Sequence, residues 1–161
     1  MYYLNVFFLF SILGHFIEST FSKNFESGIL YGYWTPVYGI GVCVILFIFY
    51  FLKKYIKNKF LLSIILFFSC GIILSILEVI GGYLIEFLFH KVFWNYKNHH
   101  FPIGKYTSLD MAFVWGISSL LIIFVLKPVI DWSIKKVPKF ITWILLFLFI
   151  LDCLLKLSIV L

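Results

Sequence analysis

Residues 60–89 read FLLSIILFFSCGIILSILEVIGGYLIEFLF and carry only two charged side chains, Glu78 and Glu86. A transmembrane helix needs about 20 mostly apolar residues, so this stretch predicts a membrane span. At 1.5 Å per residue it would be about 45 Å long, against a hydrocarbon core of about 30 Å. Such a helix must tilt, extend beyond the membrane or kink. The glycine pair Gly81–Gly82 favours a kink, which would place residues 83–93 in the outer interface.

The composition of the whole chain is that of a polytopic membrane protein. Of its 161 residues 63% are hydrophobic and 12% are charged, and the mean hydropathy is +1.09. Soluble proteins average roughly 45–50% apolar and about 25% charged residues, so a soluble enzyme, a secreted disulfide scaffold and a disordered tail are excluded. The predicted fold is all-α, a single transmembrane domain over residues 1–161, with five spans at about residues 2–21, 36–52, 60–89, 107–126 and 140–161.

The lysines predict the orientation. Two loops are rich in lysine and should lie in the cytoplasm by the positive-inside rule. The N-terminus is then inside and the C-terminus outside, and the net charge of +6 needs no nucleic-acid partner to explain it. The first span also lacks the basic start and the cleavage site of a signal peptide. The lysines concerned are Lys53, Lys54, Lys57 and Lys59 in the second loop and Lys127, Lys135, Lys136 and Lys139 in the fourth.

The chain contains no recognised catalytic motif. There is no GxxxxGK[ST] for nucleotide binding, no HExxH and no GxSxG. The three cysteines, Cys43, Cys70 and Cys153, are odd in number and none is part of a CxxC, so neither a disulfide framework nor a zinc site is predicted. We therefore expect no enzyme activity and no cofactor.

Acidic residues inside the spans are the strongest functional signal. A charge at mid-membrane costs roughly 2.5–3.5 kcal/mol even on lenient scales, so such a group normally faces the helix bundle or a wet cavity. Four acids come from four spans and are expected at one depth below the outer loops, namely Glu18, Glu78, Asp110 and Asp152. Such a layer could exchange protons or hold a cation. If the spans splay apart, each acid would only reach interfacial water.

Small and polar residues share a helix face with these acids. One interpretation is packing, because small residues allow helices to approach closely and polar residues bond across the contact. The other is a site in which Glu18 and Glu78 approach one another, with His15 and residues 34–38 as neighbours. The faces consist of Ser11, Gly14, His15, Glu18 and Ser22; of Gly71, Ser75, Glu78, Gly82 and Glu86; and of Ser108, Ala112, Gly116 and Ser119, with Asp110 near the start.

Aromatic residues crowd the two outer loops. Such residues are normally interfacial anchors, and the alternative is a lid that folds over a cavity. Asp152 and Lys156, four residues apart on one helix, are expected to neutralise each other. The aromatic candidates are Tyr31, Trp34 and Tyr38 in the first loop and Trp94 and Tyr96 in the third.

A metal site is a further alternative. His15 with Glu18, and Glu86 with His90, combine helical spacing with metal-binding side chains, and the pair His99–His100 could join them. Each pair fits an ordinary hydrogen bond equally well.

With these residues laid out, the chain resembles the ABC-transporter type IV, or CmpB-like, family of small bacterial membrane proteins. The resemblance covers roughly residues 8–130 and implies a permease-like part of a transporter in a bacterial cytoplasmic membrane. Two positions depart from the family pattern: His15 stands where Trp is usual, and Asn95 where Asp is usual. The matching blocks are Ser11–Gly14, Ile17–Glu18, Gly28–Gly32, Pro36–Gly39, Gly41, Leu77–Glu78, Leu84, Glu86, Phe93–Tyr96, Phe101, Gly104 and Lys105, with Asp110 near a family carboxylate.

Three functions remain open from the sequence. The first is a permease-like protein that binds or translocates a small solute or cation at an outward-facing acidic site between helices. The second is a non-transporting scaffold or regulatory subunit, and the third an intramembrane metalloenzyme. In an ABC system the ATPase would be a separate chain on the lysine-rich inner loops, and five spans are few for a translocation path, so we expect an oligomer or hetero-complex. The predicted binding residues are Glu18, Glu78, Glu86, His15, Asp110, Tyr31, Trp34, Tyr38, Trp94 and Tyr96.

Overall fold

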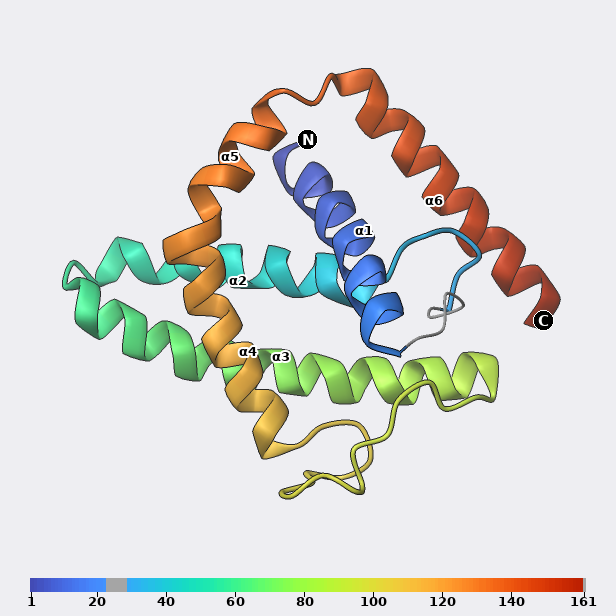
Figure 1. Cartoon of the computed structure of the whole chain (residues 1–161), viewed down its shortest axis with the longest axis horizontal. Coiled ribbons are helices and arrows are strands. Elements are labelled where there is room, and N and C mark those ends of the chain that lie inside the picture. The colour runs from blue at the N-terminus through green and yellow to red at the C-terminus, as the bar shows by residue number, and fades with distance from the viewer. Residues whose placement is uncertain (23–28, 161) are drawn as a thin grey trace. The chain divides into compact units, whose positions relative to one another are not determined.

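The computed structural model of the chain describes residues 1–22 and 29–160 (Figure 1). Helices α4, η1 and α5 follow one another without a break, so the described chain has five helical runs long and apolar enough to cross a membrane. The predicted all-α fold with five spans is confirmed. The elements are α1 (Tyr2–Ser22), α2 (Pro36–Tyr55), α3 (Lys59–Phe89), α4 (Leu109–Leu121), the π-helical turn η1 (Ile122–Leu126), α5 (Lys127–Lys135) and α6 (Lys139–Val160).

The chain groups into two compact units. The first contains residues 1–43 and 128–161, and the second contains residues 44–127. Helix α2 begins in the first unit and ends in the second.

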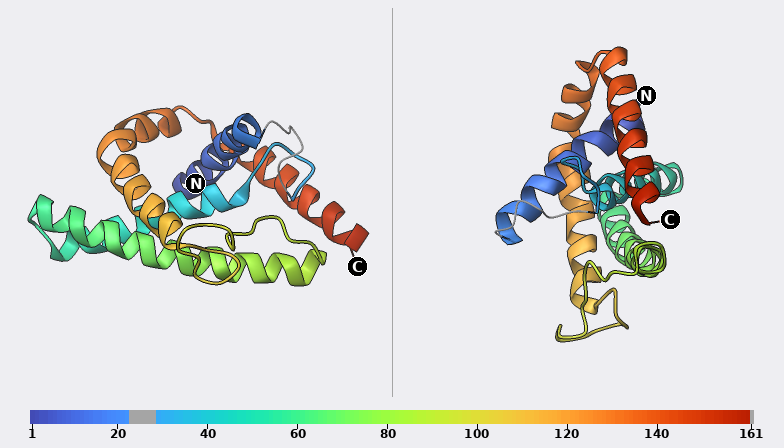
Figure 2. Two further views of the ribbon diagram at one scale, coloured as in Figure 1. Left: turned by 60° about the horizontal axis from the view of Figure 1, so that its bottom comes forward. Right: turned by 90° about the vertical axis from the view of Figure 1, so that its right-hand side faces the viewer.

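The long third span is one continuous helix in the second unit. The side chain of Asn58 caps its start by accepting hydrogen bonds from the backbone N–H groups of Phe60 and Leu61, at 2.9 and 3.3 Å. The expected kink at Gly81–Gly82 does not interrupt α3, which stays helical to Phe89 (Figure 2). Gly82 instead allows the ring of Tyr106 to pack closely on the helix, because a Cβ at this position would overlap the ring.

Helix α4 crosses α3 in the second unit, and small residues line the contact (Figure 1, Figure 2). A Cβ at Gly71 would lie 2.8 Å from the carbonyl oxygen of Ala112, and one at Gly116 would lie 2.6 Å from the Phe67 ring. The glycines therefore let the two backbones approach, as the packing interpretation predicts for these positions.

The fourth span is longer than predicted. It was expected to end near residue 126, but the π-helical turn carries it into α5, so Lys127 and Lys135 are helical and the connection to α6 shrinks to residues 136–138. Pro128, which cannot donate a backbone hydrogen bond to the preceding turn, lies inside this run. The widened turn η1 ends two residues before it, a departure from α-helical pairing at which the helix continues.

Polar contacts join α1 to the C-terminal helices in the first unit. The Thr142 hydroxyl donates to the Asn5 amide oxygen at 2.6 Å, and both side chains are buried. The Tyr2 hydroxyl donates to the Asp131 carboxylate, also at 2.6 Å. Because these bonds link the start of α1 to α5 and α6, they order the three helices of this unit.

The two adjacent glycines of α3 offer a matched test of the Tyr106 contact. Gly82→Ala should destabilise the protein by about 1–3 kcal/mol, because the methyl group overlaps the Tyr106 ring. Gly81→Ala should be neutral or stabilise by up to about 1 kcal/mol, because the space beside Gly81 is open and alanine favours helix. Thermal unfolding in detergent measures both, and equal effects would contradict the contact.

Candidate functional site

Asp152 of α6 is an acid of the first unit that holds a loop through three hydrogen bonds. It is buried, and its carboxylate accepts hydrogen bonds from the backbone N–H groups of Tyr31 and Gly32, at 3.0 and 2.7 Å, and from the Trp34 indole N–H, at 2.7 Å. The expected Asp152–Lys156 pair is wrong: among the described residues no ion pair joins them. The Lys156 ammonium instead lies 4.4 Å from the centre of the Tyr31 ring. Asp152 thus ties the loop before α2 to the last helix.

Glu18 lies near the end of α1 in the same unit. Its carboxylate accepts a long hydrogen bond of 3.4 Å from the Thr35 hydroxyl and also interacts with the side chain of Tyr38. Tyr38 was expected in the loop but lies in the first turn of α2, where its ring packs on Gly14. The backbone N–H of Thr35 donates to the carbonyl of Ser11 at 2.9 Å, which holds the start of α2 beside α1.

Glu78 is the corresponding acid of the second unit. Its side chain lies within α3 and is only 6% exposed. Its two oxygens accept hydrogen bonds from the Tyr96 hydroxyl, at 3.0 Å, and from the Thr107 hydroxyl, at 2.9 Å. Both donors come from the connection between α3 and α4, and both are electrically neutral.

Glu86, two turns further along α3, has a different environment. It forms an ion pair with Lys105 and accepts a hydrogen bond from the Tyr106 hydroxyl. The Trp94 indole N–H donates to the Tyr106 carbonyl at 3.3 Å. Glu86 is therefore neutralised within its own unit, and Trp94 serves as a loop contact.

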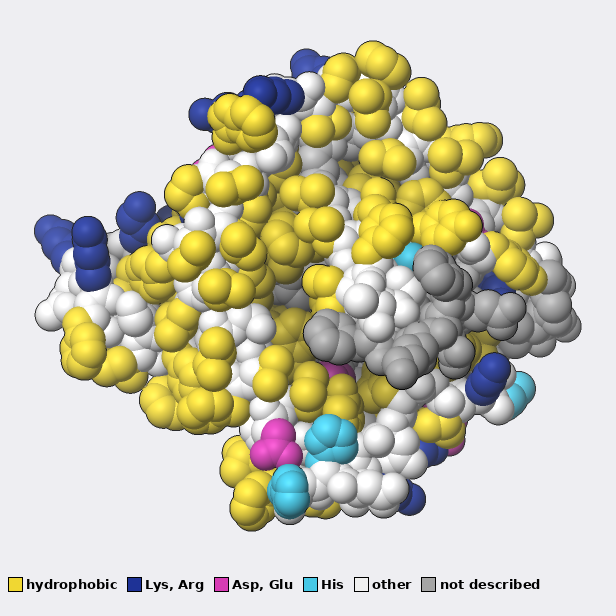
Figure 3. Space-filling view, in the orientation of Figure 1, with side chains coloured by type: hydrophobic (Ala, Val, Ile, Leu, Met, Phe, Trp, Pro, Cys, Tyr) yellow, Lys and Arg dark blue, Asp and Glu magenta, His cyan; other side chains and the backbone are white. Residues whose placement is uncertain are grey.

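Asp110 lies in the first turn of α4, in the second unit. It is 3.9 Å from the imidazole of His99, and the side chains are 42% and 44% exposed. Figure 3 shows acidic and histidine side chains together over the connection between α3 and α4. The negative charge of Asp110 in the first turn of α4 interacts favourably with the positive end of the helix dipole. A structural role therefore accounts for Asp110.

Several buried polar atoms have no hydrogen-bond partner among the described residues. They include both ring nitrogens of His15, which is 4% exposed, and the hydroxyl of Ser75, which is 8% exposed. Each of these residues lies one helical turn before a glutamate, His15 before Glu18 and Ser75 before Glu78. Buried polar groups are normally bonded, so these positions call for an explanation.

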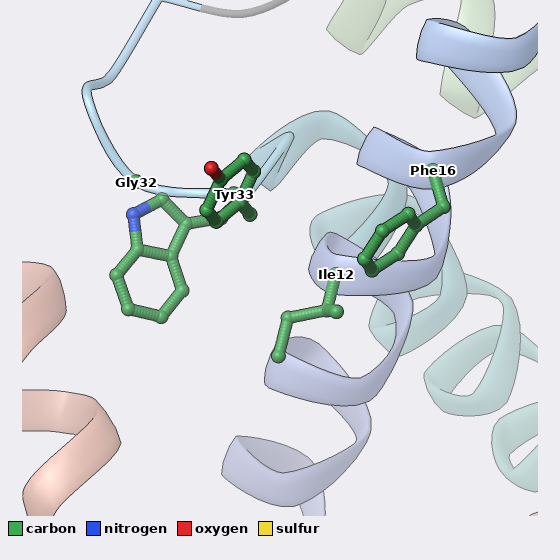
Figure 4. A pocket seen from close by; sticks show the side chains of 5 residues that line it. Ile12, Phe16, Gly32 and Tyr33 are labelled. Carbon is green, nitrogen blue, oxygen red and sulfur yellow. The ribbon is translucent and has the colours of Figure 1, made fainter. Parts of the chain in front are cut away.

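An apolar groove of about 350 Å³ lies beside His15 in the first unit. Figure 4 shows Ile12 and Phe16 of α1 facing Gly32 and Tyr33 of the loop, and Trp34 completes the lining. The ring of Tyr33 also meets the imidazole of His15 edge to face, with centroids 5.3 Å apart. Among residues 1–22 and 29–160, no charged side chain lines this groove, so the described lining suits an apolar group rather than an ion.

The metal-site alternative gains no support from the geometry. Within residues 1–22 and 29–160, no three histidine, cysteine or acidic side chains converge as metal ligands. Glu86, one of its proposed ligands, is taken by Lys105 and Tyr106.

The structure brings the predicted residues together within each unit. Glu78 meets Tyr96, and Glu18 meets Tyr38. Sequence reasoning missed the two threonines, although Thr35 directly precedes α2 and Thr107 directly precedes Ser108, the N-cap of α4. Glu18 and Glu78 belong to different units, so their approach to one another stays a prediction.

The Lys105–Glu86 contact should be lost at strongly alkaline pH. The hydrogen bond from the Lys105 ammonium to Glu86 raises the pKa of Lys105 above the ordinary 10.5. The stabilisation is therefore complete below pH 10.5 and is lost as the pH rises through the higher folded-state pKa. Trp94 fluorescence should report this transition. Burial raises the pKa of Tyr106 as well, so Lys105→Met is the control: an unchanged transition in that variant would contradict the assignment.

Comparison with known proteins identifies a family. A family model described as "Putative ABC-transporter type IV" matches residues 5–157, whereas no curated protein and no solved structure matches the chain. The matched region extends beyond the blocks recognised in the sequence and includes Asp152 of α6. With five apolar helices and a family match over most of its length, the chain is a multi-pass membrane protein that belongs to the ABC-transporter type IV (CmpB) family.

Proposed function

We propose that the chain is the permease-like membrane component of a transport system and that it binds a small solute or cation at the carboxylates below its two aromatic loops. The observation that carries this proposal is the environment of Glu78. This carboxylate is buried in a span, and its hydrogen-bond donors, Tyr96 and Thr107, are neutral. None of the ion pairs among the described residues includes Glu78.

A buried carboxylate without a basic partner is costly in a membrane, so such groups mark ion and substrate pathways. A bound cation would supply the missing positive charge. Because the two hydroxyl donors come from the α3–α4 connection, a movement of that connection would change the ligands offered to the cation. This arrangement supports a site whose occupancy is coupled to the position of the loop.

We propose the outward orientation for these loops and a separate ATPase on the other side. Lysine side chains gather at the turn between α2 and α3 and, in the other unit, around the turn between α5 and α6 (Figure 3). These turns are the cytoplasmic surfaces expected from the positive-inside rule. They offer positive charge to an acidic partner, and the chain itself has no nucleotide-binding motif. Native co-purification of a nucleotide-binding chain, lost when Lys53, Lys54 and Lys57 become glutamine, would test this partner.

The contacts of the small residues speak against the alternative of a non-transporting scaffold. Gly71, Gly82 and Gly116 already face side chains or backbone of their own unit. They are therefore not free to form the helix contact with a partner chain that a scaffold was expected to make.

The test of the proposed function is ligand-dependent stability. The purified protein in lipid nanodiscs is heated in the presence of a panel of cations and small solutes. A ligand at 100 times its dissociation constant stabilises the folded state by about 2.7 kcal/mol. We expect at least one ligand to raise the unfolding temperature of the wild type and to have no such effect on Glu78→Gln. If no ligand does so, or if the variant responds like wild type, the proposal fails.

A further inference from the structure

Glu18 and Glu78, which belong to different units, have similar partners. Each carboxylate interacts with one threonine hydroxyl and one tyrosine side chain: Thr35 and Tyr38 for Glu18, and Thr107 and Tyr96 for Glu78. They differ in that Glu18 is half-buried whereas Glu78 is buried, and in that Glu78 also interacts with the Trp115 side chain. We refer to the two sets as the Glu18 trio and the Glu78 trio.

The threonines occupy similar places in the chain, which differ by one residue relative to the helix that follows. Thr35 directly precedes the first residue of α2, and Thr107 directly precedes the N-cap of α4. In each case the glutamate lies on the helix before the connection and the threonine at the start of the helix after it. The two connections therefore share one order along the chain, a glutamate on the helix before and a threonine just ahead of the helix after. Such internal repetition is known in transporters.

The helix positions before the two glutamates also correspond. The spacing Ser11, His15, Glu18 on α1 matches the spacing Gly71, Ser75, Glu78 on α3. His15 and Ser75 are both more than nine-tenths buried, and His15 nitrogens and the Ser75 hydroxyl make no hydrogen bond within the described chain. Each lies on the same helix face as its glutamate, one turn away. An unsatisfied buried polar group beside each trio independently indicates a position for a ligand or its hydration water.

We propose that the Glu18 trio is a second binding site equivalent to the Glu78 trio and that each site binds one monovalent metal cation. This rests on the function proposed for Glu78 and extends it to Glu18. Carboxylate and hydroxyl oxygens are the ligands of hard cations rather than of transition metals. Each trio contains one carboxylate, so a single positive charge neutralises it, whereas a divalent ion would leave an excess charge in the membrane.

The test is the stoichiometry of sodium binding, measured with a radioactive sodium tracer on the purified full chain in nanodiscs. Wild type should bind two ions per chain, Glu18→Gln and Glu78→Gln one each, and the double variant none. Glu86→Gln is the matched control and should still bind two, because Lys105 already neutralises Glu86. Thr35→Val and Thr107→Val retain the carboxylates and should each weaken one site about tenfold. Displacement by potassium would support the assignment to monovalent cations.

The outcomes separate this inference from the proposed function. Binding of one ion that is lost in Glu78→Gln and retained in Glu18→Gln overturns the equivalence of the trios and leaves the function proposed for Glu78 intact. Absence of sodium and potassium binding, with stabilisation by another ligand that depends on Glu78, overturns the monovalent-cation assignment alone. Absence of any such ligand overturns both.

Discussion

Asp152→Ala is expected to release the loop before α2 and to lower the unfolding temperature by roughly 5–10 °C. The substitution removes the acceptor of three hydrogen bonds, from the backbone of Tyr31 and Gly32 and from the indole of Trp34. An unsatisfied buried donor costs about 1–3 kcal/mol, and rehydration of the freed loop recovers part of this, so a net loss of about 3 kcal/mol is expected. Thermal unfolding in detergent, followed by Trp fluorescence, measures the effect.

Two further variants make this prediction specific. Asp152→Asn keeps an oxygen that accepts hydrogen bonds and should fall between wild type and alanine. Lys156→Met should change the unfolding temperature by only a degree or two, because Lys156 contacts the Tyr31 ring and does not pair with Asp152. If Lys156→Met were as damaging as Asp152→Ala, the local i, i+4 ion pair would be the better description.

The second large effect concerns which loops face outward, and it is close to all-or-none. In a background without Cys43, Cys70 and Cys153, single cysteines are introduced for Tyr33 or Asn98 and for Lys57 or Lys136, all of which are exposed. In intact cells an impermeant thiol reagent should label the first two positions and leave the other two unlabelled. The physical reason is the excess of lysine in the loops that hold residues 57 and 136.

Permeabilised cells provide the control for that experiment. All four cysteines should react once the membrane is opened. This result would show that the cysteines at positions 57 and 136 stay unlabelled in intact cells because of their location. The reverse pattern in intact cells would invert the topology and place the Glu18 and Glu78 trios on the cytoplasmic side, against the outward-facing site proposed above.

The fold was largely predictable because the bilayer imposes it. Length and hydropathy are properties of each segment alone, and the five spans were recovered within a few residues except at the fourth. There the lysines of residues 127–135 are a local signal for a loop, while the helix continues through η1 into α5. The same difference explains Gly82: a glycine pair predicts bending, but the ring that fills the space comes from Tyr106, in another part of the sequence.

The site was predictable in its acids and not in their partners. Residues that the membrane should exclude are conspicuous, so Glu18 and Glu78 were identified from one sequence. The partner of Asp152 was predicted wrongly because Lys156 is close to it in sequence, whereas its actual donors lie about 120 positions away. A threonine hydroxyl gives no signal at all in composition, and the importance of Thr35 and Thr107 appears only when the connections are folded.

The neutrality of the hydrogen-bond donors has a consequence for biogenesis. Glu18, Glu78 and Asp152 are held by hydroxyl, indole and backbone N–H groups, whereas Glu86 is held by a lysine. A loop that carries many cations tends to be retained inside the cell during synthesis. In the orientation proposed above, the contacts of Glu18, Glu78 and Asp152 therefore order the loops without adding positive charge to the segments that the insertion machinery has to translocate.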